Sequence, residues 1–452
     1  MFREDDSARD GALARLGGGL NTRVVAGRAT GLIEKRHLVL KRWYADQAAR
    51  RGAAFLDFGT DYGYPFYDKF RPTLDAMDAL GRGAESARHY PSSYGTAELR
   101  EEFRQFMHRQ FEVTLDPHAE VMVTTGASQA FDAITRSYAG RYLLVPELAL
   151  STVTSIGVGN GAEVVRVPMD QHFRPVLAEL DAILERIGGH DVRCLYINSP
   201  TNPTGTVLGR EYLTELVALA RRHGVLVLHD HDSWYTVHRG ERSVNILEIP
   251  GAMDVAVTVL SVSKELGLPG LRVGLMAGNP SVINDLRIHN SEFCVMIPEF
   301  CQDAVAAALR ASTDDGIRED VQDRISAALT AAVQGWRDLG WPEDALLPPQ
   351  AGYKFLLRPP AGFDSTAEGE LTGVDTFDFL LAREAGVKLS TSRSFNAGSA
   401  DWMRMIIMQD VDVVEHFFER LAAIGVHYRM TPPTGLAAQL REIVSQFDLW
   451  DL

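Results

Sequence analysis

The chain has 452 residues, of which 46% are hydrophobic and 23% charged, and its formal net charge is −15. This length and composition predict a globular protein of two or three folding units, and the acidic balance argues against nucleic acid or an anionic membrane as a partner. The three cysteines lack the paired spacing of a zinc site or a disulfide framework, and no apolar run resembles a signal peptide or reaches membrane-spanning length. We therefore expect a cytoplasmic protein.

The amino-terminal part predicts a loose arm followed by a helix over residues 38–50. An apolar run at 55–58 then enters a glycine-containing loop that carries Asp61 and Tyr62. Further on, Tyr90 opens the segment Tyr-Pro-Ser-Ser-Tyr-Gly, which precedes a predicted helix at 98–109. Loop residues of this kind fit an exposed turn as well as a ligand contact.

A short strand at 121–125 turns into a helix at Gly126, Ala127 and Ser128. The first turn of a helix offers free backbone amides and the positive end of the helix dipole, both of which favour a bound phosphate. This signal is weak by itself, because many strand-to-helix turns have a similar sequence.

Apolar strands then alternate with amphipathic helices. The strands are predicted at 142–145, 163–167, 194–198, 225–230, 255–260 and 271–276, and one of the helices at 210–222. Strands without polar alternation predict a mostly parallel sheet covered by helices on both faces, and ligands bind such sheets beyond the carboxyl ends of the strands. Asn198, Asp230 and Lys264 each stand at or just after such an end.

The last third of the chain predicts a smaller α/β unit. A helix at 320–340 leads to a strand at 356–360, a helix at 376–384, a strand at 402–408 and a short terminal helix. We therefore expect an arm and part of the small domain at 1–70, a large domain at 71–325, and a small domain with a tail at 326–452.

One segment between two predicted strands carries most of the chemistry. Ser261-Val-Ser263-Lys264 follows the first strand, and Gly-Leu-Pro-Gly-Leu-Arg272-Val-Gly leads into the second. A lysine amine that has lost hydration can attack a carbonyl and form a Schiff base, and the two serine hydroxyls and Arg272 suit a phosphate beside it. For the Ser-x-Ser-Lys pattern alone, an ordinary surface lysine is the alternative.

Two polar stretches follow other strands of the same predicted sheet. Asn198-Ser-Pro-Thr-Asn202-Pro-Thr-Gly forms a rigid turn that can project amides inward, and a second strand ends in His229-Asp230-His231-Asp232. The latter stretch could be a metal cluster, but strand alternation places the histidines on one face and the aspartates on the other, which argues against a metal site.

Arg404 lies within the apolar run Trp-Met-Arg-Met-Ile-Ile-Met. An arginine inside such a strand needs an anionic partner, and its planar guanidinium pairs well with the carboxylate of an amino acid. An interdomain salt bridge is the alternative.

Together these motifs resemble the class I/II aminotransferase family of fold-type-I pyridoxal-phosphate enzymes, over roughly residues 57–424. The spacing from Lys264 to Arg272 matches the family's cofactor-lysine signature, and the Asn198 turn resembles its Asn-Pro-x-Asn-Pro-Thr-Gly turn with Ser199 before Pro200. The resemblance implies an α/β fold with a large and a small domain, pyridoxal 5′-phosphate as cofactor, an α-amino acid as substrate, and a homodimer with active sites at the interface.

The resemblance also implies roles for individual residues. Lys264 would bind the cofactor and move the α-proton, Asp230 would face the pyridine nitrogen, and Asn202 would reach the phenolic oxygen. Arg404, with Asn202, Asp61 and Tyr62, would contact the substrate, while Tyr90 would cross the dimer interface to a phosphate. The remaining implied cofactor contacts are Gly126, Ala127, Ser128, Ser233, Ser261, Ser263 and Arg272.

Two departures from the family pattern leave the reaction type open. No aromatic residue is available to stack on the ring in the loop after residue 145, so Leu148 or Leu150 takes that place, and Ser233 stands where a tyrosine normally follows the ring aspartate. The lysine segment is also similar to that of 1-aminocyclopropane-1-carboxylate synthases, which act on S-adenosylmethionine. Elimination, replacement or cyclisation is therefore the alternative to transamination, and a non-catalytic cofactor-binding regulator or scaffold is a second one, against which Lys264, Asp230 and Arg404 together argue.

Overall fold

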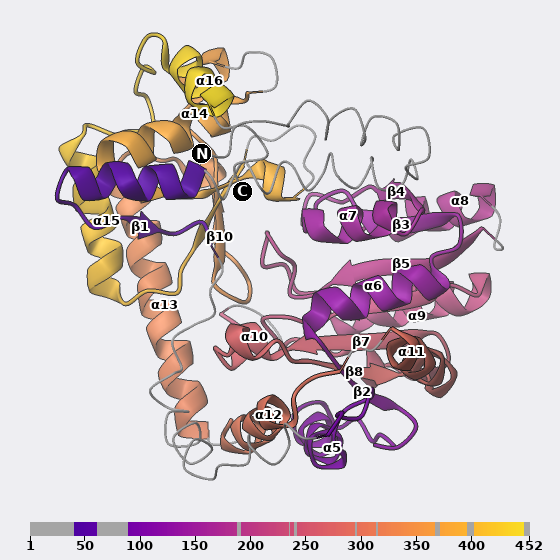
Figure 1. The fold of residues 1–452 in the computed structure, drawn as a ribbon. Helices are drawn as coiled ribbons and strands as arrows, with labels where there is room; N and C mark the ends of the chain where they lie inside the picture. Colours follow the sequence, from indigo (N-terminus) through magenta and orange to yellow (C-terminus); the bar gives the residue numbers. More distant parts are fainter. Residues whose placement is uncertain are drawn as a thin grey trace, which may run out of the picture.

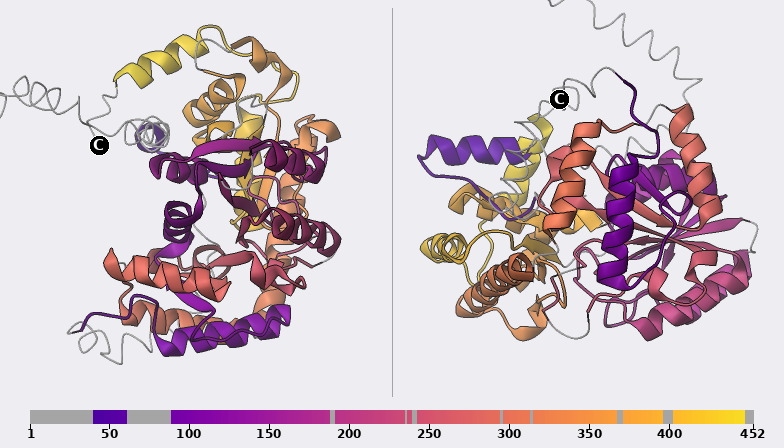
Figure 2. Two further views of the ribbon diagram at one scale, coloured as in Figure 1. Left: turned by 90° about the vertical axis from the view of Figure 1, so that its right-hand side faces the viewer. Right: turned by 90° about the horizontal axis from the view of Figure 1, so that it is seen from below.

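A computed structural model describes residues 40–60, 89–187, 191–234, 236–238, 242–293, 296–312, 315–366, 371–395 and 402–446. These residues form a larger unit around a seven-stranded sheet and a smaller unit around a four-stranded sheet (Figure 1, Figure 2). The expected α/β fold, with a large sheet between helices and a smaller α/β domain, is thus confirmed.

The seven strands of the large sheet lie in the order β2-β8-β7-β6-β5-β3-β4. The pairs from β4 to β7 are parallel, and β8 is antiparallel to both β7 and β2. The sheet is therefore mostly parallel, as predicted. Its strands are β2 (Val121–Thr124), β3 (Tyr142–Pro146), β4 (Glu163–Val167), β5 (Val192–Asn198), β6 (Leu226–Asp230), β7 (Ala256–Ser261) and β8 (Gly274–Gly278).

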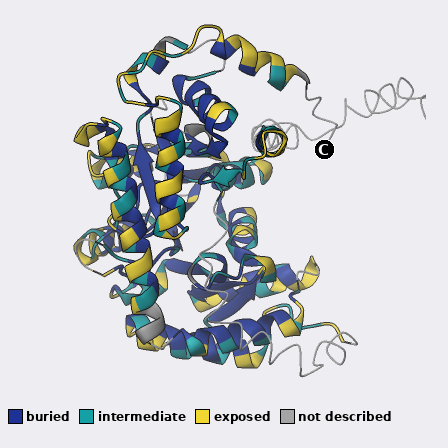
Figure 3. Cartoon of the chain, turned by 90° about the vertical axis from the view of Figure 1, so that its left-hand side faces the viewer, coloured by how far each residue is buried: buried dark blue, intermediate teal, exposed yellow. Residues whose placement is uncertain are grey.

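Helices cover both faces of this sheet because its strands are apolar on both sides (Figure 3). One face packs against α6 through Phe131 and Ile134, and the other packs against α9 through Leu213 and Leu216. The helices of the larger unit are α5 (Ala97–Phe111), α6 (Gly126–Tyr138), α7 (Ser151–Gly159), α8 (Leu177–Ile187), α9 (Arg210–His223), α11 (Pro280–Glu292) and α12 (Glu299–Ala311).

The long helix α13 (Asp315–Asp338) leads from α12 into the smaller unit, where it lies beside α15 (Val411–Ala423) (Figure 1). Trp336 of α13 is fully buried and packs edge-on against Phe417 of α15. The other elements of this unit are a helix over 40–50, β1 (Leu56–Asp57), β9 (Leu346–Leu347), β10 (Lys354–Leu357), α14 (Gly373–Leu380), β11 (Val387–Lys388), β12 (Ser390–Thr391), β13 (Met403–Ile406) and α16 (Leu436–Gln446).

The small sheet is antiparallel, in the order β12-β13-β10-β9, and β1 pairs in parallel with β11 beside it. β1 precedes the larger unit in the chain, whereas β11 follows it. An amino-terminal segment therefore pairs with a strand of the smaller unit.

Two local predictions around the lysine are wrong. The strand predicted at 271–276 begins only at Gly274, because Pro269–Leu271 form a 3-10 turn and Arg272 has a left-handed backbone with φ of 54°. The predicted turn at Lys264 is a helical turn, α10 (Val262–Glu265). Apolar patterning locates buried segments but does not show where the backbone leaves the strand conformation.

Candidate active site

Two predicted site residues, Asp230 and Lys264, lie with Asn198 at one edge of the large sheet, because β5, β6 and β7 are parallel and end together. Asn198 and Asp230 are direct partners in the register of β5 and β6, and Lys264 follows the end of β7 by three residues. Lys264 is half-buried on α10, whose first residues are held by Ser261. The Ser261 hydroxyl accepts a 3.2 Å hydrogen bond from the amide of Ser263.

A second feature of this edge is the close contact between the start of α6 and Arg272. Gly126 opens α6 with a φ of 72°, and a β-carbon there would lie 2.9 Å from Nη2 of Arg272. The side chain of Thr125, the residue before α6, accepts no hydrogen bond from the first amides of the helix. The amides of Ala127 and Ser128 are therefore available to a ligand on the side of Arg272. The guanidinium and the helix amides together provide a positive potential suited to an anion.

Asp230 ends β6 as a buried carboxylate. The Tyr196 hydroxyl donates a 2.7 Å hydrogen bond to its Oδ2, and the Asn198 side chain donates a 2.8 Å bond to its backbone carbonyl. Burial, together with repulsion from Asp232, raises the pKa of Asp230 to about 7, although Tyr196 and the ammonium groups of Lys354 and Lys264 oppose the rise. A buried carboxylate of this kind is stabilised by any cation placed against it.

Asn202 and Arg404 come from different units and are in direct contact. Nη1 of Arg404 donates a 2.7 Å hydrogen bond to Oδ1 of Asn202, and Asn202 is held by a 2.5 Å bond from its amide to Oδ1 of Asn198. Arg404 is 6% exposed, so its charge is directed toward the site rather than toward solvent.

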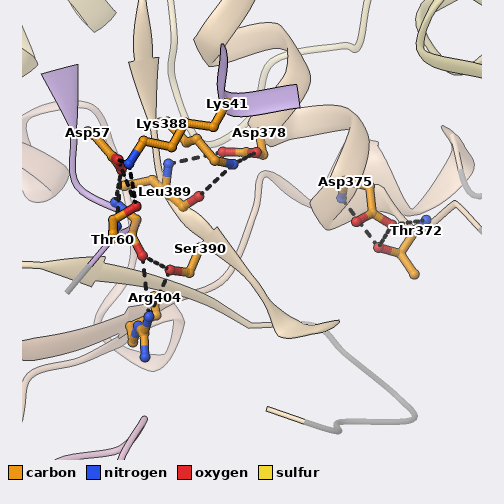
Figure 4. A network of polar contacts seen from close by, with 11 residues as sticks. Lys41, Asp57, Thr60, Thr372, Asp375, Asp378, Lys388, Leu389, Ser390 and Arg404 are labelled. Atoms are coloured by element: carbon orange, nitrogen blue, oxygen red, sulfur yellow. Dashed lines mark hydrogen bonds and ion pairs between the residues drawn. The ribbon is translucent and has the colours of Figure 1, made fainter. Parts of the chain in front are cut away.

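A polar network in the smaller unit fixes Arg404 from behind (Figure 4). Its Nη2 donates to Ser390 Oγ at 3.0 Å and to the carbonyl of Gly59 at 3.3 Å. The turn that contains Gly59 is organised by Asp57, which accepts from the amides of Gly59 and Thr60 and pairs with Lys41 at 2.6 Å. The side chain of Arg404 is thus connected to the helix over residues 40–50.

Lys354 lies against Asp232 and Ser233, two and three residues after Asp230, and was not predicted from the sequence. It is 3% exposed on β10, donates a 3.0 Å hydrogen bond to Ser233 Oγ and approaches Asp232 Oδ2 to 3.8 Å. Ser233 therefore contacts a cation from the smaller unit. A signal was available, because Lys354 stands in an apolar strand just as Arg404 does.

Other predicted residues lie apart or outside the described part of the chain. Tyr90 is 93% exposed, which suits a contact outside its own protomer, whereas Asp61 and Tyr62 lie outside the described residues. Leu148 lines a small pocket with Tyr196 and Asn198 next to the site, and Leu150 precedes α7. The position of Leu148 therefore supports it over Leu150 as the apolar neighbour of a bound ring.

The histidine pair of the β6 segment is structural. The rings of His229 and His231 stack with centroids 4.8 Å apart, and burial lowers the pKa of His229 to about 3. His231 is held by Ser243 and Asn245 at 2.9 and 2.7 Å. Within the described ranges no group of three or more His, Cys, Asp or Glu side chains is placed to hold a metal ion.

The residues at this edge fit pyridoxal 5′-phosphate. The guanidinium of Arg272 can approach the start of α6 this closely only because residue 126 has no side chain. A buried carboxylate with a raised pKa, Asp230, suits a protonated ring nitrogen, and Lys264 supplies an amine nearby. The fold and these residues together define a fold-type-I pyridoxal-phosphate enzyme.

The family model described as aminotransferase class I and II matches residues 63–421 of the chain. LL-diaminopimelate aminotransferase 2 of Nostoc sp. is 28% identical over 367 residues, which cover 80% of this chain and 90% of that protein. L-glutamine–4-(methylsulfanyl)-2-oxobutanoate aminotransferase of Bacillus subtilis is 24% identical over 348 residues, which cover 76% and 83%. The chain belongs to the class I and II aminotransferases.

Solved structures agree with this fold. The substrate-bound structure of BacF from Bacillus subtilis has a TM-score of 0.75 at 19% identity and covers 87% of this chain and 95% of its own. An aromatic aminotransferase from Pyrococcus horikoshii OT3 has a TM-score of 0.70 at 23% identity and covers 82% and 95%.

The protein is therefore a pyridoxal-phosphate-dependent aminotransferase that acts on an amino acid. The two relatives described above are aminotransferases, which does not favour the elimination, replacement or cyclisation alternative. In the part of the chain that the structure describes, every helix is too short or too polar to cross a membrane.

Proposed function

We propose that the edge formed by β5, β6, β7 and α10 is the active site, in which Lys264 holds pyridoxal 5′-phosphate and an α-amino acid exchanges its amino group for the keto oxygen of a 2-keto acid. The observation that carries this proposal is the 2.7 Å bond between Arg404 and Asn202, at the same edge as Asp230. That bond connects a carboxylate-binding side chain of the smaller unit to the strand ends of the larger one.

The phosphate binds between the amides of Gly126, Ala127 and Ser128 and the guanidinium of Arg272, with the hydroxyls of Ser261 and Ser263 beside it. The close approach of Gly126 to Arg272 and the uncapped start of α6 support this assignment. Two fixed positive sources hold a dianionic group more tightly than either would alone.

The ring and the substrate are held by residues from both units. Asp230 pairs with the ring nitrogen, Asn202 donates to the phenolic oxygen, Ser233 and Leu148 border the ring, and Arg404 binds the substrate carboxylate. Asp61 and Tyr62 complete the substrate side, a role that the sequence resemblance alone supports.

The bound cofactor supplies an electron sink for the bonding electrons of the substrate's α-carbon. Lys264 would act as the general base and acid there, since its Nζ could accept the α-proton of the substrate and hold it for a later transfer. Arg404 orients the substrate so that the α-hydrogen points toward that amine. Burial of Asp230 excludes water from the far end of the ring.

The active form is a cytoplasmic homodimer with sites at the interface, in which Tyr90 reaches a phosphate of the partner subunit. The 93% exposure of Tyr90 in the protomer supports this role. The chain divides into an arm with part of the small domain at 1–70, a large domain at 71–325 and a small domain with a tail at 326–452. The second boundary falls inside α13.

Borohydride reduction of the cofactor-loaded protein followed by peptide mass spectrometry tests this proposal. We expect the reduced cofactor on Lys264, and we expect Lys264→Ala to remove the covalent label while still binding the cofactor. Lys41→Ala is a matched control, because Lys41 is an ion-paired lysine away from α10. A label on another lysine of the wild-type protein would contradict the assignment.

A further inference from the structure

Two buried cations of the smaller unit lie on one face of its sheet. Leu356 of β10 is the direct partner of Arg404 of β13, and Lys354 is the partner of Ile406. Because residues two apart in a strand share a face, Lys354 and Arg404 project from the same side. Arg404 meets the segment after β5, and Lys354 meets the segment after β6.

The position of Lys354 is fixed by backbone contacts between the two units. The amide of Gly352 donates to the carbonyl of Thr236 at 2.6 Å, and that of His238 donates to Gln350 at 2.8 Å. A β-carbon at Gly352 would lie only 3.0 Å from the Cβ of Ser233, which itself has a left-handed backbone with φ of 58°. Lys354 is therefore held against Ser233 and Asp232 by the chain on both sides.

The carboxylate of Asp230 interacts with charged and polar groups from four parts of the chain. Tyr196 of β5 donates to it, Asp232 of its own segment repels it, and Lys264 of α10 and Lys354 of β10 attract it. Of these groups, Asp232 and Lys354 carry opposite charges and form an ion pair with each other, in which Nζ of Lys354 lies 3.8 Å from Oδ2 of Asp232. A buried carboxylate beside a like charge stays ionised only when a cation balances that charge.

We propose that Lys354 is a positioning residue which, together with Asp232, sets the charge of the Asp230 carboxylate at the end of β6. Through Lys354, a charge of the smaller unit would thus influence the ionisation of Asp230 in the larger unit. The consequence for the cofactor rests on the proposed function, because it assumes that Asp230 faces the ring nitrogen. The effect of Lys354 on the charge of Asp230 does not depend on that assumption.

The direct test is a pH titration of the cofactor-free protein, labelled with ¹³Cγ-aspartate, with Asp230→Asn used to assign the resonance of Asp230. We expect Lys354→Met to raise the titration midpoint of Asp230 by about 1 pH unit, because an attracting charge is removed. Asp232→Asn should lower the midpoint by a similar amount, and Lys354→Arg should restore the wild-type value. Shifts of opposite sign within one ion pair are not expected from a general loss of packing.

Lys388→Met is the matched control, because Lys388 is also a buried strand lysine of the smaller unit, paired with Asp378 at 2.8 Å. It should lower stability without moving the midpoint of Asp230. A midpoint unchanged by Lys354→Met, or one not lowered by Asp232→Asn, would overturn the inference. If Lys354→Met does not fold, Lys354→Gln takes its place in the same titration, because it also removes the charge while keeping a polar side chain for Ser233.

The cofactor arm of the experiment separates this inference from the proposed function. Spectrophotometric titration with pyridoxal 5′-phosphate should give a dissociation constant whose pH dependence moves with the Asp230 midpoint in each variant. If the NMR midpoints shift as expected but the pH dependence of cofactor binding does not follow, the inference about Lys354 stands. The placement of Asp230 at the ring nitrogen would then be wrong.

Discussion

At the scale of single residues, the site depends on charges that each have several partners. Arg404 donates to Asn202, to Ser390 and to the carbonyl of Gly59, and its ring neighbour is Phe395, whose centroid lies 4.9 Å from the guanidinium carbon. These bonds fix the plane of the guanidinium before any substrate arrives. A substrate carboxylate that makes two parallel hydrogen bonds to this guanidinium would replace one of the two Nη2 bonds, to Ser390 or to Gly59.

Arg404→Lys keeps the charge and loses the fork, so binding of the substrate carboxylate should weaken. We expect KM for amino-acid substrates to rise about 10- to 100-fold, the size expected for loss of one charge-assisted hydrogen bond, with at most a small change in cofactor affinity. Steady-state kinetics and a cofactor titration on the same preparation measure both. If KM stayed constant while the free energy of unfolding fell, Arg404 would serve as an interdomain tie.

The raised pKa of Asp230 predicts that the free energy of unfolding of the cofactor-free protein depends on pH. Its folded-state pKa of about 7 exceeds the ordinary value of 3.8, so the folded state binds the proton more tightly than the unfolded state. The contribution of this group to the free energy of unfolding is therefore largest at low pH and is lost as pH rises through this window. Asn at position 230 never becomes charged, so the Asp230→Asn variant does not lose this stability as pH rises. Above pH 7 it should be more stable than the cofactor-free wild type by roughly 1 to 3 kcal/mol.

Urea unfolding of cofactor-free wild type and Asp230→Asn at a series of pH values measures this difference. The advantage of the variant should shrink toward zero near pH 4. A difference that is independent of pH would mean that packing, and not the charge of Asp230, separates the two proteins.

Individual residues also show what the sequence can and cannot predict. Asp230 and Arg404 were predictable because each polar side chain ends or interrupts an apolar run, and Asn202 because its turn resembles the family's Asn-Pro-x-Asn-Pro-Thr-Gly turn. The same argument applied to Lys354 would have marked it as buried and paired. It could not have named Asp232 and Ser233 as partners, because that pairing depends on how the two units pack.

At the scale of elements, the proposed phosphate site lies where two chain segments approach closely. A β-carbon at Gly274, the first residue of β8, would lie 2.6 Å from the Thr124 hydroxyl and 2.7 Å from the carbonyl carbon of Gly126. β8 therefore presses against the junction of β2 and α6, and the guanidinium of Arg272, just before β8, reaches the start of α6. The spacing of Lys264 and Arg272 marked this segment, but the left-handed backbone that begins β8 late is not encoded in the apolar pattern.

Gly126→Ala tests this junction. The new methyl group would lie 2.9 Å from Nη2 of Arg272, and the left-handed φ of 72° disfavours any side chain by about 1 kcal/mol. We expect cofactor affinity to fall at least about tenfold, because both the guanidinium and the first turn of α6 must shift.

Gly159→Ala provides the control, since a β-carbon there meets nothing within 4 Å. Fluorescence-monitored cofactor titration of both variants gives the comparison. Equal dissociation constants for Gly126→Ala and wild type would place the phosphate elsewhere.

At the scale of the whole molecule, the smaller unit is assembled from both ends of the chain, and this assembly reaches the site. Lys41 and Asp57, from before the larger unit, organise the turn whose Gly59 carbonyl holds Arg404, from after it (Figure 4). The mostly parallel sheet and the small α/β unit were predictable from alternating apolar segments. The antiparallel insertion of β8 was not, because a strand buried on both faces has the same pattern in either direction.

The exposed position of Tyr90 bears on the assembly beyond the protomer. Its neighbour Tyr94 is held between the guanidinium groups of Arg100 and Arg287, at 5.0 and 4.8 Å from the ring centroid. The base of the segment is thus anchored while Tyr90 projects into solvent. A large exposed aromatic on an anchored segment is typical of a surface that contacts another protein.

If Tyr90 serves the site of a partner subunit, two inactive variants should complement each other. In a mixed dimer of Tyr90→Phe and Lys264→Ala, one site has both defects, and the other has an intact Lys264 and receives an intact Tyr90. After random subunit exchange, about one quarter of all sites should regain wild-type cofactor affinity, a fraction fixed by the two-fold symmetry of the dimer. Borohydride labelling at low cofactor concentration counts these sites. No gain over the average of the separate variants would mean either that Tyr90 acts within its own subunit, so that the mixed dimer contains no complete site, or that Tyr90 does not affect cofactor binding.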